Sequence, residues 1–125
     1  MKSRVSPQET AQFLRRKEEE RQRQLDSAFA QATADAQAII AMIKTNYLPR
    51  HVYQWGSLLR RERFTEASDI DIAVEGLASP DAIFRLSADA EELSDFPIDI
   101  VELEHIAPMH HESILKNGLQ VFPNE

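Results

Sequence analysis

The stretch YQWGSLLRRERFTEASDIDIAV, residues 53–74, decides the fold, because it joins a glycine–serine turn to a strand that opens with two carboxylates. From Asp69 onward, polar and apolar side chains alternate, which predicts a strand with Asp69 and Asp71 on one face and branched apolar side chains on the other. Two carboxylates on one face repel each other, and burying them without partners is costly. The stretch therefore predicts a strand that carries a binding site for a positively charged group.

The sequence on either side predicts helices and further strands. Ser6-Pro7-Gln8-Glu9 has the pattern of a helix start, and the helix is expected to reach about Asn46. Gly118 stands at a natural helix C-cap, after which the last apolar residues can pack back onto the sheet. The other expected elements are strands at 51–55, 69–75 and 98–103, a loop at 58–68, and helices starting at 79–81 and spanning about 108–117.

The two halves of the long N-terminal helix differ in character. Residues 15–24, RRKEEERQRQ, contain no apolar side chain and cannot pack on a core of their own. From Leu25 to Ile43, apolar residues recur at spacings of four and three, which predicts one buried stripe. We therefore predict a charged helical arm over residues 1–24 and a domain over residues 25–125 that includes the second half of the helix. The arm is either a solvated helix or a docking element for a partner.

Composition narrows the class of protein. The 125 residues carry 14 Lys+Arg against 21 Asp+Glu, a net charge of −7, which argues against long nucleic acid as a partner. The absence of cysteine excludes disulfides and thiolate metal sites and fits a reducing cytoplasm. No segment approaches the roughly 20 apolar residues of a membrane span, and the N-terminus lacks a signal-peptide pattern. We expect a cytoplasmic protein with no membrane contact.

The carboxylates have the spacing of a metal site for phosphate chemistry. Side chains two apart on a strand have Cα atoms roughly 6.6 Å apart, so Asp69 and Asp71 can each reach a pair of ions about 4 Å apart. Magnesium suits such a site because it takes oxygen ligands and completes its shell with water and phosphate. Asp99, alone in an apolar strand, is a third candidate ligand because a place beside the other two would explain it.

The glycine–serine turn offers the other half of a nucleotide site. Gly56 allows close backbone approach to a phosphate, and the Ser57 hydroxyl can donate to its oxygens. Arg60, Arg61 and Arg63 follow within one short loop, which makes a local positive exception in an acidic chain. Ordinary surface aspartates at a strand end are the plain alternative for the Asp-x-Asp pair alone.

Together, the segments YQWGS, SDIDIAVEGL, FPIDIVELEHIAP and ILKNGLQVF resemble the minimal nucleotidyltransferases (MNT proteins) of the DNA polymerase β-like nucleotidyltransferase superfamily. The resemblance covers about residues 36–122. It implies an α/β (α+β) nucleotidyltransferase fold, a mixed β-sheet flanked by helices, here with a long N-terminal helix.

The resemblance also implies roles for the site residues. Gly56 and Ser57 become the triphosphate-binding turn, Asp69 and Asp71 the ligands of two Mg²⁺ ions, and Asp99 the third acidic residue, which binds one metal and helps deprotonate the attacking hydroxyl. The resemblance further implies that this hydroxyl attacks the α-phosphate of a nucleotide, usually ATP, and releases pyrophosphate. Eleven residues separate Ser57 from Asp69 where the family has ten, and Arg61 stands where a glycine is common.

MNT proteins are commonly antitoxins paired with a HEPN-domain ribonuclease toxin. The resemblance therefore implies a Mg²⁺-dependent adenylyltransferase whose substrate is a hydroxyl, in particular a tyrosine, on a HEPN partner. Two alternatives stay open: a non-catalytic antitoxin that masks the toxin by binding, and a transferase for a small hydroxyl substrate.

Overall fold

The computed structural model describes residues 4–124, and its longest element is helix α1, Pro7–Tyr47. The helix begins as the sequence predicts: Glu9 N donates to Ser6 Oγ, and Ser6 N donates to Glu9 Oε1, both at 3.0 Å. It ends at Tyr47, one residue past the predicted end, and the next residue, Leu48, takes a left-handed conformation with φ 46°. The predicted long N-terminal helix is confirmed.

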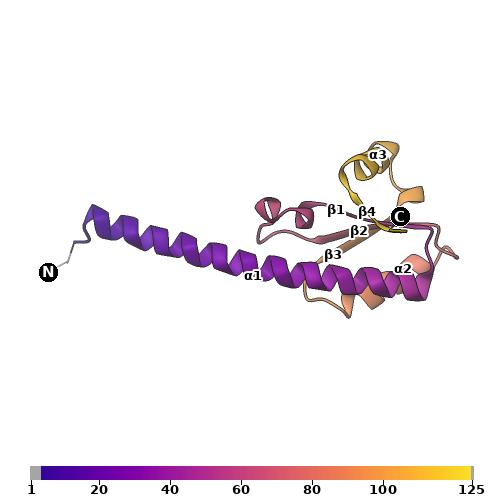
Figure 1. The fold of residues 1–125 in the computed structure, drawn as a ribbon, viewed down its shortest axis with the longest axis horizontal. Helices are drawn as coiled ribbons and strands as arrows, with labels where there is room; N and C mark the ends of the chain where they lie inside the picture. The colour runs from indigo at the N-terminus through magenta and orange to yellow at the C-terminus, as the bar shows by residue number, and fades with distance from the viewer. Residues whose placement is uncertain (1–3, 125) are drawn as a thin grey trace.

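Four strands form one mixed sheet in the order β3-β2-β1-β4 (Figure 1). Strand β1 is antiparallel to both β2 and β4, whereas β3 is parallel to β2. The α/β (α+β) class, with a mixed sheet flanked by helices, is thereby confirmed. The bounds are β1 His51–Trp55, β2 Ile70–Glu75, α2 Ala82–Glu91, β3 Ile98–Glu102, α3 Pro108–Asn117 and β4 Leu119–Phe122.

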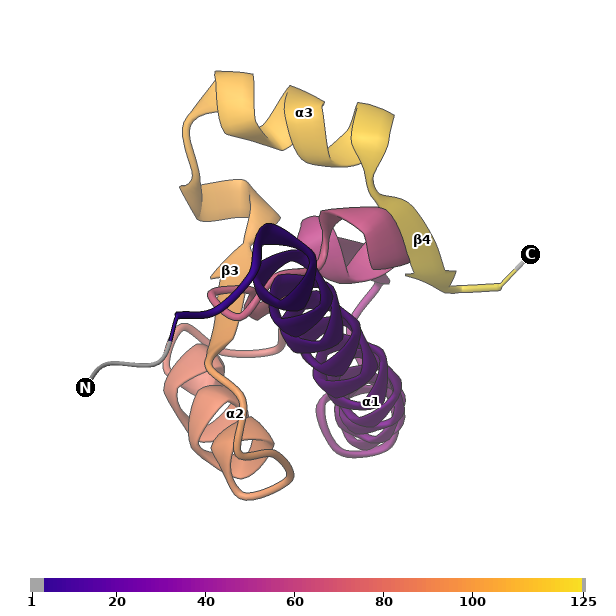
Figure 2. The same ribbon diagram turned by 90° about the vertical axis from the view of Figure 1, so that its left-hand side faces the viewer.

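The two faces of the sheet carry cores of unequal size. Helices α1 and α2 cover one face, where Ile70, Ile72 and Val74 of β2 pack into the larger core with the apolar stripe of α1. Helix α3 covers part of the other face, where Ala73 packs with Ile114 and with residues of β1 and β3. Figure 2 looks nearly along α1 and shows α2 on its side of the sheet and α3 beyond the strands. The alternation in β2 thus assigns its carboxylates to the face that α3 only partly covers.

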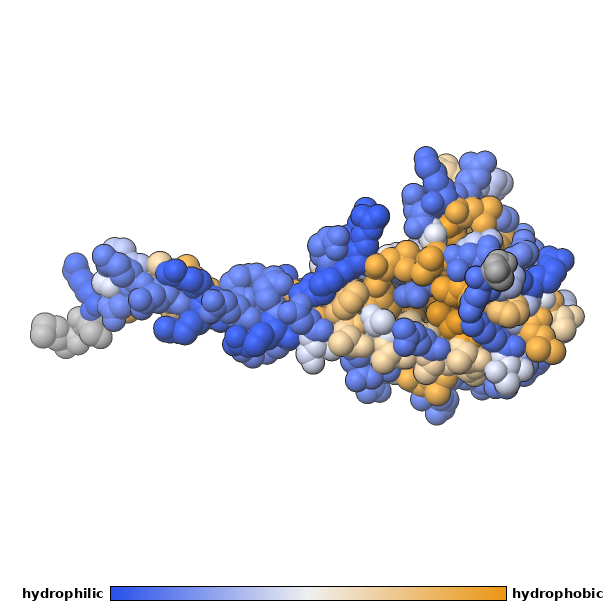
Figure 3. Space-filling model, in the orientation of Figure 1, coloured by the Kyte–Doolittle hydropathy of each residue, from blue (hydrophilic) through white to orange (hydrophobic). Residues whose placement is uncertain are grey.

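The first half of α1 extends beyond the rest of the molecule as a hydrophilic rod (Figure 3). Leu25 is the first buried residue of the helix, as the apolar stripe predicts. Phe13 and Leu14 lie on this rod with more than half of their surface exposed. The division into an arm at 1–24 and a domain at 25–125 stays a prediction, and its outermost residues, 1–3 and 125, lie outside the described part.

Several boundaries differ from the predicted ones. Strand β2 begins at Ile70, so Asp69 lies just before it, and the predicted loop contains two short 3₁₀ turns, Ser57–Leu59 and Arg61–Arg63. Residues 119–122, expected only to pack on the sheet, form its edge strand β4. Gly118 does cap α3, but with φ −84°; a side chain there would place Cβ 2.6 Å from the Ile114 carbonyl, so close approach explains the glycine.

Across residues 4–124, none of the helices combines the length and apolar character that crossing a membrane requires.

The two halves of α1 should respond differently to truncation of an apolar side chain. Ile39 is fully buried, so Ile39→Ala should lower the free energy of unfolding by about 2–5 kcal/mol. Leu14→Ala, on the exposed rod, should change it by less than about 0.5 kcal/mol. Chemical denaturation of both variants checks this, and equal losses would contradict a projecting first half.

Candidate active site

Carboxylates from two parallel strands meet at one end of the sheet. Asp71 of β2 lies opposite Asp99 of the neighbouring strand β3 and, on its other side, opposite Trp55 of β1. Asp69 lies one residue before β2. Burial, together with the negative charges of Asp99 and Asp69, raises the pKa of Asp71 from 3.8 to about 6. The structure thus brings together the three predicted aspartates into one electrostatically coupled group.

The glycine–serine turn lies directly against this group. Gly56 has φ +88°, a conformation that side chains disfavour, and a Cβ built there would lie 2.1 Å from Asp71 Oδ2. Glycine at this position is therefore required both by backbone conformation and by contact with the carboxylate. Ser57 begins a 3₁₀ turn, and its hydroxyl donates to Ser68 Oγ at 2.7 Å.

A cleft of ≈ 670 Å³ opens beside the turn, between the β1–β2 loop (residues 56–69) and α3. Trp55 and Gly56 line it from the end of β1, and the cations Arg60, Arg63 and Lys116 lie along it. Sequence reasoning missed Lys116, although it lies in the segment ILKNGLQVF, because nothing local indicates that α3 folds back over β1. The cleft therefore combines apolar walls with positive charge. None of the three aspartates lines it, and Gly56 is the residue that both lines the cleft and contacts Asp71.

Arg61, predicted to bind nucleotide, is directed elsewhere. Its Nε donates to Asp26 Oδ1 at 2.5 Å, and its Nη2 donates to Gln22 Oε1 at 3.0 Å, both on α1. Arg60, the other predicted arginine, lines the cleft. Only Arg60 of this pair therefore has the placement expected for contact with a ligand in the cleft.

The donor set of the aspartates fits magnesium. Carboxylate oxygens are the ligands that this ion prefers, and it retains water and phosphate oxygens in the rest of its shell. Among residues 4–124, no three acidic, histidine or cysteine side chains are gathered closely enough to hold an ion by themselves. Asp69, Asp71 and Asp99 thus fit magnesium by the chemistry of their oxygens alone, and water and phosphate oxygens would have to complete the shell.

Comparison with known proteins agrees with this geometry. Residues 37–125, more than half of the chain, match the model of the family described as Polymerase beta, Nucleotidyltransferase. The chain belongs to this nucleotidyltransferase family. No curated protein matches it.

Three solved structures that are similar to this nucleotidyltransferase are toxin–antitoxin complexes. A complex with AMP-PNP shares 25% identity and a TM-score of 0.57, over 68% of this chain and 70% of the other. An MntA–HepT complex shares 24% identity and a TM-score of 0.52, over 70% of this chain and 69% of the other. A mutant MntA–HpeT complex shares 22% identity and a TM-score of 0.55, over 68% of this chain and 70% of the other. The latter two likenesses are evidence of a shared fold alone.

The raised pKa of Asp71 predicts that its charge opposes folding at neutral pH. Because the folded-state pKa of about 6 exceeds the ordinary 3.8, the stabilisation from protonated Asp71 is complete below pH ~4 and is lost as pH rises through 6. Asp71→Asn should therefore melt at a higher temperature than the metal-free wild type above pH 6, and at nearly the same temperature at pH 4. Melting curves from pH 4 to 8 check this.

The matched control is Asp95→Asn, an exposed aspartate in the turn between α2 and β3. The difference in melting temperature between Asp95→Asn and the wild type should be about the same at pH 4 and at pH 8. A difference for Asp71→Asn that is the same at pH 4 and pH 8 would contradict the electrostatic coupling.

Proposed function

We propose that this protein is a Mg²⁺-dependent adenylyltransferase that transfers AMP from ATP to a hydroxyl of a partner HEPN toxin and acts as its antitoxin. The observation that carries the proposal is the contact of the Gly56 turn with Asp71, whose strand neighbour in register is Asp99. Nucleotidyl transfer needs a phosphate-binding turn next to metal-binding carboxylates, and the contact of Gly56 with Asp71 supports these two roles. Membership of the nucleotidyltransferase family supports the reaction class.

Each site residue has a proposed role. Asp69, Asp71 and Asp99 would hold two Mg²⁺ ions, which when bound offset the negative charge that develops on the phosphates. The backbone of Gly56 and the hydroxyl of Ser57 would receive the triphosphate, with Arg60 supplying positive charge from the cleft. Trp55 is a candidate wall for the adenine ring, since it lines the same cleft.

Asp99 is the candidate base for the acceptor hydroxyl, because it is exposed on β3 and therefore accessible to a second substrate. The acceptor oxygen forms a bond to the α-phosphorus of ATP. The bond from that phosphorus to the β-phosphate oxygen breaks, and pyrophosphate leaves. The hydroxyl proton passes to the Asp99 carboxylate and then to water.

The partner is proposed from the similar complexes. One is an MntA–HepT toxin–antitoxin complex and another contains AMP-PNP, an ATP analogue. We therefore propose a HEPN toxin as the partner, a tyrosine hydroxyl as the acceptor, and the cytoplasm as the compartment.

A non-catalytic antitoxin is the second candidate, and the direction of Arg61 favours it. The guanidinium of Arg61 contacts α1 at Asp26 and Gln22, so the β1–β2 loop offers less positive charge to a triphosphate than its sequence indicates. Such a protein would mask the toxin by binding alone.

Thermal stability with ATP and Mg²⁺ separates the two candidates. Ligand at a hundred times its dissociation constant adds about 2.7 kcal/mol, which for a domain of this size should raise the melting temperature by about 10 °C. ATP or Mg²⁺ alone should do much less, because ATP brings negative charge towards three carboxylates and Mg²⁺ alone lacks the phosphate oxygens. The measurement is a melting curve with each component and with both.

The double variant Asp69→Asn/Asp71→Asn should lose this synergy and also the transfer of labelled AMP to the co-purified partner. Glu91→Gln, an exposed carboxylate at the end of α2, is the control and should retain both. The masking antitoxin would be favoured by two results together. ATP and Mg²⁺ would then stabilise the wild type no more than either one alone, and the double variant would bind the partner as well as the wild type does.

A further inference from the structure

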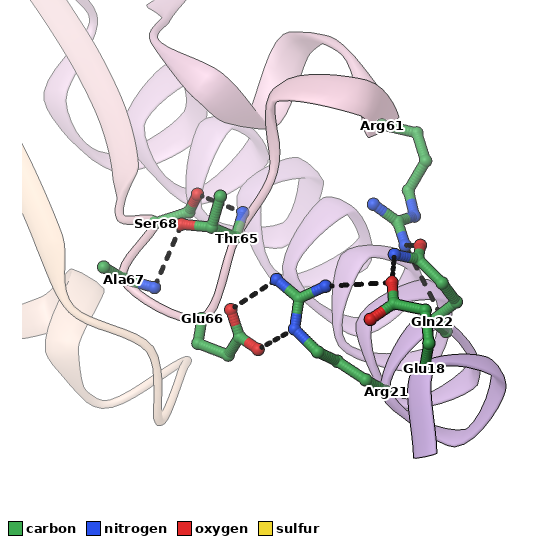
Figure 4. A network of polar contacts seen from close by, with 8 residues as sticks. All are labelled: Glu18, Arg21, Gln22, Arg61, Thr65, Glu66, Ala67 and Ser68. Carbon is green, nitrogen blue, oxygen red and sulfur yellow. Dashed lines mark hydrogen bonds and ion pairs between the residues drawn. The ribbon is translucent and has the colours of Figure 1, made fainter. Parts of the chain in front are cut away.

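The β1–β2 loop is attached to α1 by polar contacts at two points (Figure 4). The first point is Arg61 of the loop, which donates to the side chains of Asp26 and Gln22 on α1. Its Nη2 also donates to the backbone carbonyl of Gln22 at 3.4 Å. From α1, Arg21 reaches the loop and donates to Glu66 with Nε at 2.9 Å and with Nη2 at 3.4 Å. The loop is thus held on both sides of Phe64.

Phe64 itself packs into the core beneath these contacts. It is buried, and its ring meets Phe29 of α1 edge-on, with centroids 5.5 Å apart. Gln22, Asp26 and Phe29 follow one another at spacings of four and three, so they lie on one face of α1. A continuous face of the helix therefore supports the loop, with an apolar contact at one end and polar contacts at the other.

The polar contacts continue from the loop to the turn at the active site. Ser68 Oγ accepts from Thr65 N at 2.8 Å and from Ser57 Oγ at 2.7 Å. Glu66, the residue that Arg21 holds, lies between Thr65 and Ser68. The segment fixed to α1 is therefore bonded directly to the serine of the proposed phosphate-binding turn.

We propose that Gln22 and Asp26 are positioning residues for the β1–β2 loop and that they act through Arg61. The part of α1 where the helical arm joins the domain is thereby part of the nucleotide site. The consequence for nucleotide affinity rests on the proposed function. A loop that holds its binding conformation only part of the time lowers the apparent affinity by that fraction. The Arg61–Asp26 pair lies at the surface, where ion pairs add little to global stability. Its removal should thus act on the loop and spare the fold.

The test is Asp26→Ala in the full-length chain, with ATP and Mg²⁺ as the probe. Calorimetric titration should give a dissociation constant about three- to tenfold higher than in the wild type, while the melting temperature of the metal-free protein stays within about 4 °C. Hydrogen exchange, measured without nucleotide, should show faster exchange at the loop amides of Arg63 and Phe64, which donate within the second 3₁₀ turn.

Arg23→Ala is the matched control, because Arg23 forms a 2.5 Å ion pair with Glu20 on the same helix and has no hydrogen bond to the loop. It should change neither affinity nor loop exchange. The exchanged pair Asp26→Arg/Arg61→Asp should recover most of the affinity lost in Asp26→Ala, since the ion pair re-forms in the opposite sense.

Direct binding of phosphate by Arg61 gives opposite results. Asp26→Ala would then free Arg61 and leave the affinity unchanged or tighter, and the exchanged pair would not recover binding; either result overturns the proposal. If the wild type binds no ATP with Mg²⁺, the proposed function fails, and loop exchange still decides the positioning role. Unchanged exchange in Asp26→Ala overturns that role.

Discussion

The contact between the Gly56 turn and the Asp71 carboxylate constrains the rest of the structure. It requires β1 and β2 to pair so that Trp55 lies opposite Asp71, because only then does the turn that follows β1 lie against the carboxylate. A shift of one residue would turn the isoleucines of β2 away from α1 and the aspartates into the core. The register that buries the core is therefore the register that builds the site, and a sequence cannot satisfy one without the other.

The site works against the stability of the metal-free fold. Three carboxylates at one end of the sheet repel each other, and partial burial adds to the cost, as the raised pKa of Asp71 shows. The compensation lies on the opposite face, where the fully buried Ile39, Ile43 and Ile72 join α1 to the sheet. This division explains why the carboxylates lie on the face that α3 only partly covers: the large core can be complete without them.

Features that depend on residues close together in the sequence could be predicted from it. The capping box at Ser6, the stripe that starts at Leu25 and the alternation in β2 each depend on residues a few positions apart, and the structure has all three. Features set by long-range packing could not. The direction of Arg61 depends on Asp26, 35 positions away, and the place of Lys116 in the cleft depends on how α3 folds back over β1. The extra residue between Ser57 and Asp69 marked this loop as unusual, but only the packed helix shows where the arginine is directed.

Helix α1 thus connects three parts of the molecule that the sequence presents separately. Its second half forms the core, and the face at Gln22 and Asp26 holds the β1–β2 loop. Its first half presents Phe13 and Leu14 to solvent about 20 Å from Asp26, at 1.5 Å per residue. A helix transmits a change in its position along its length, because each turn is hydrogen-bonded to the next. If a partner protein docks on the arm, the residues that position the loop are the first supporting contacts of the site that the docking can displace.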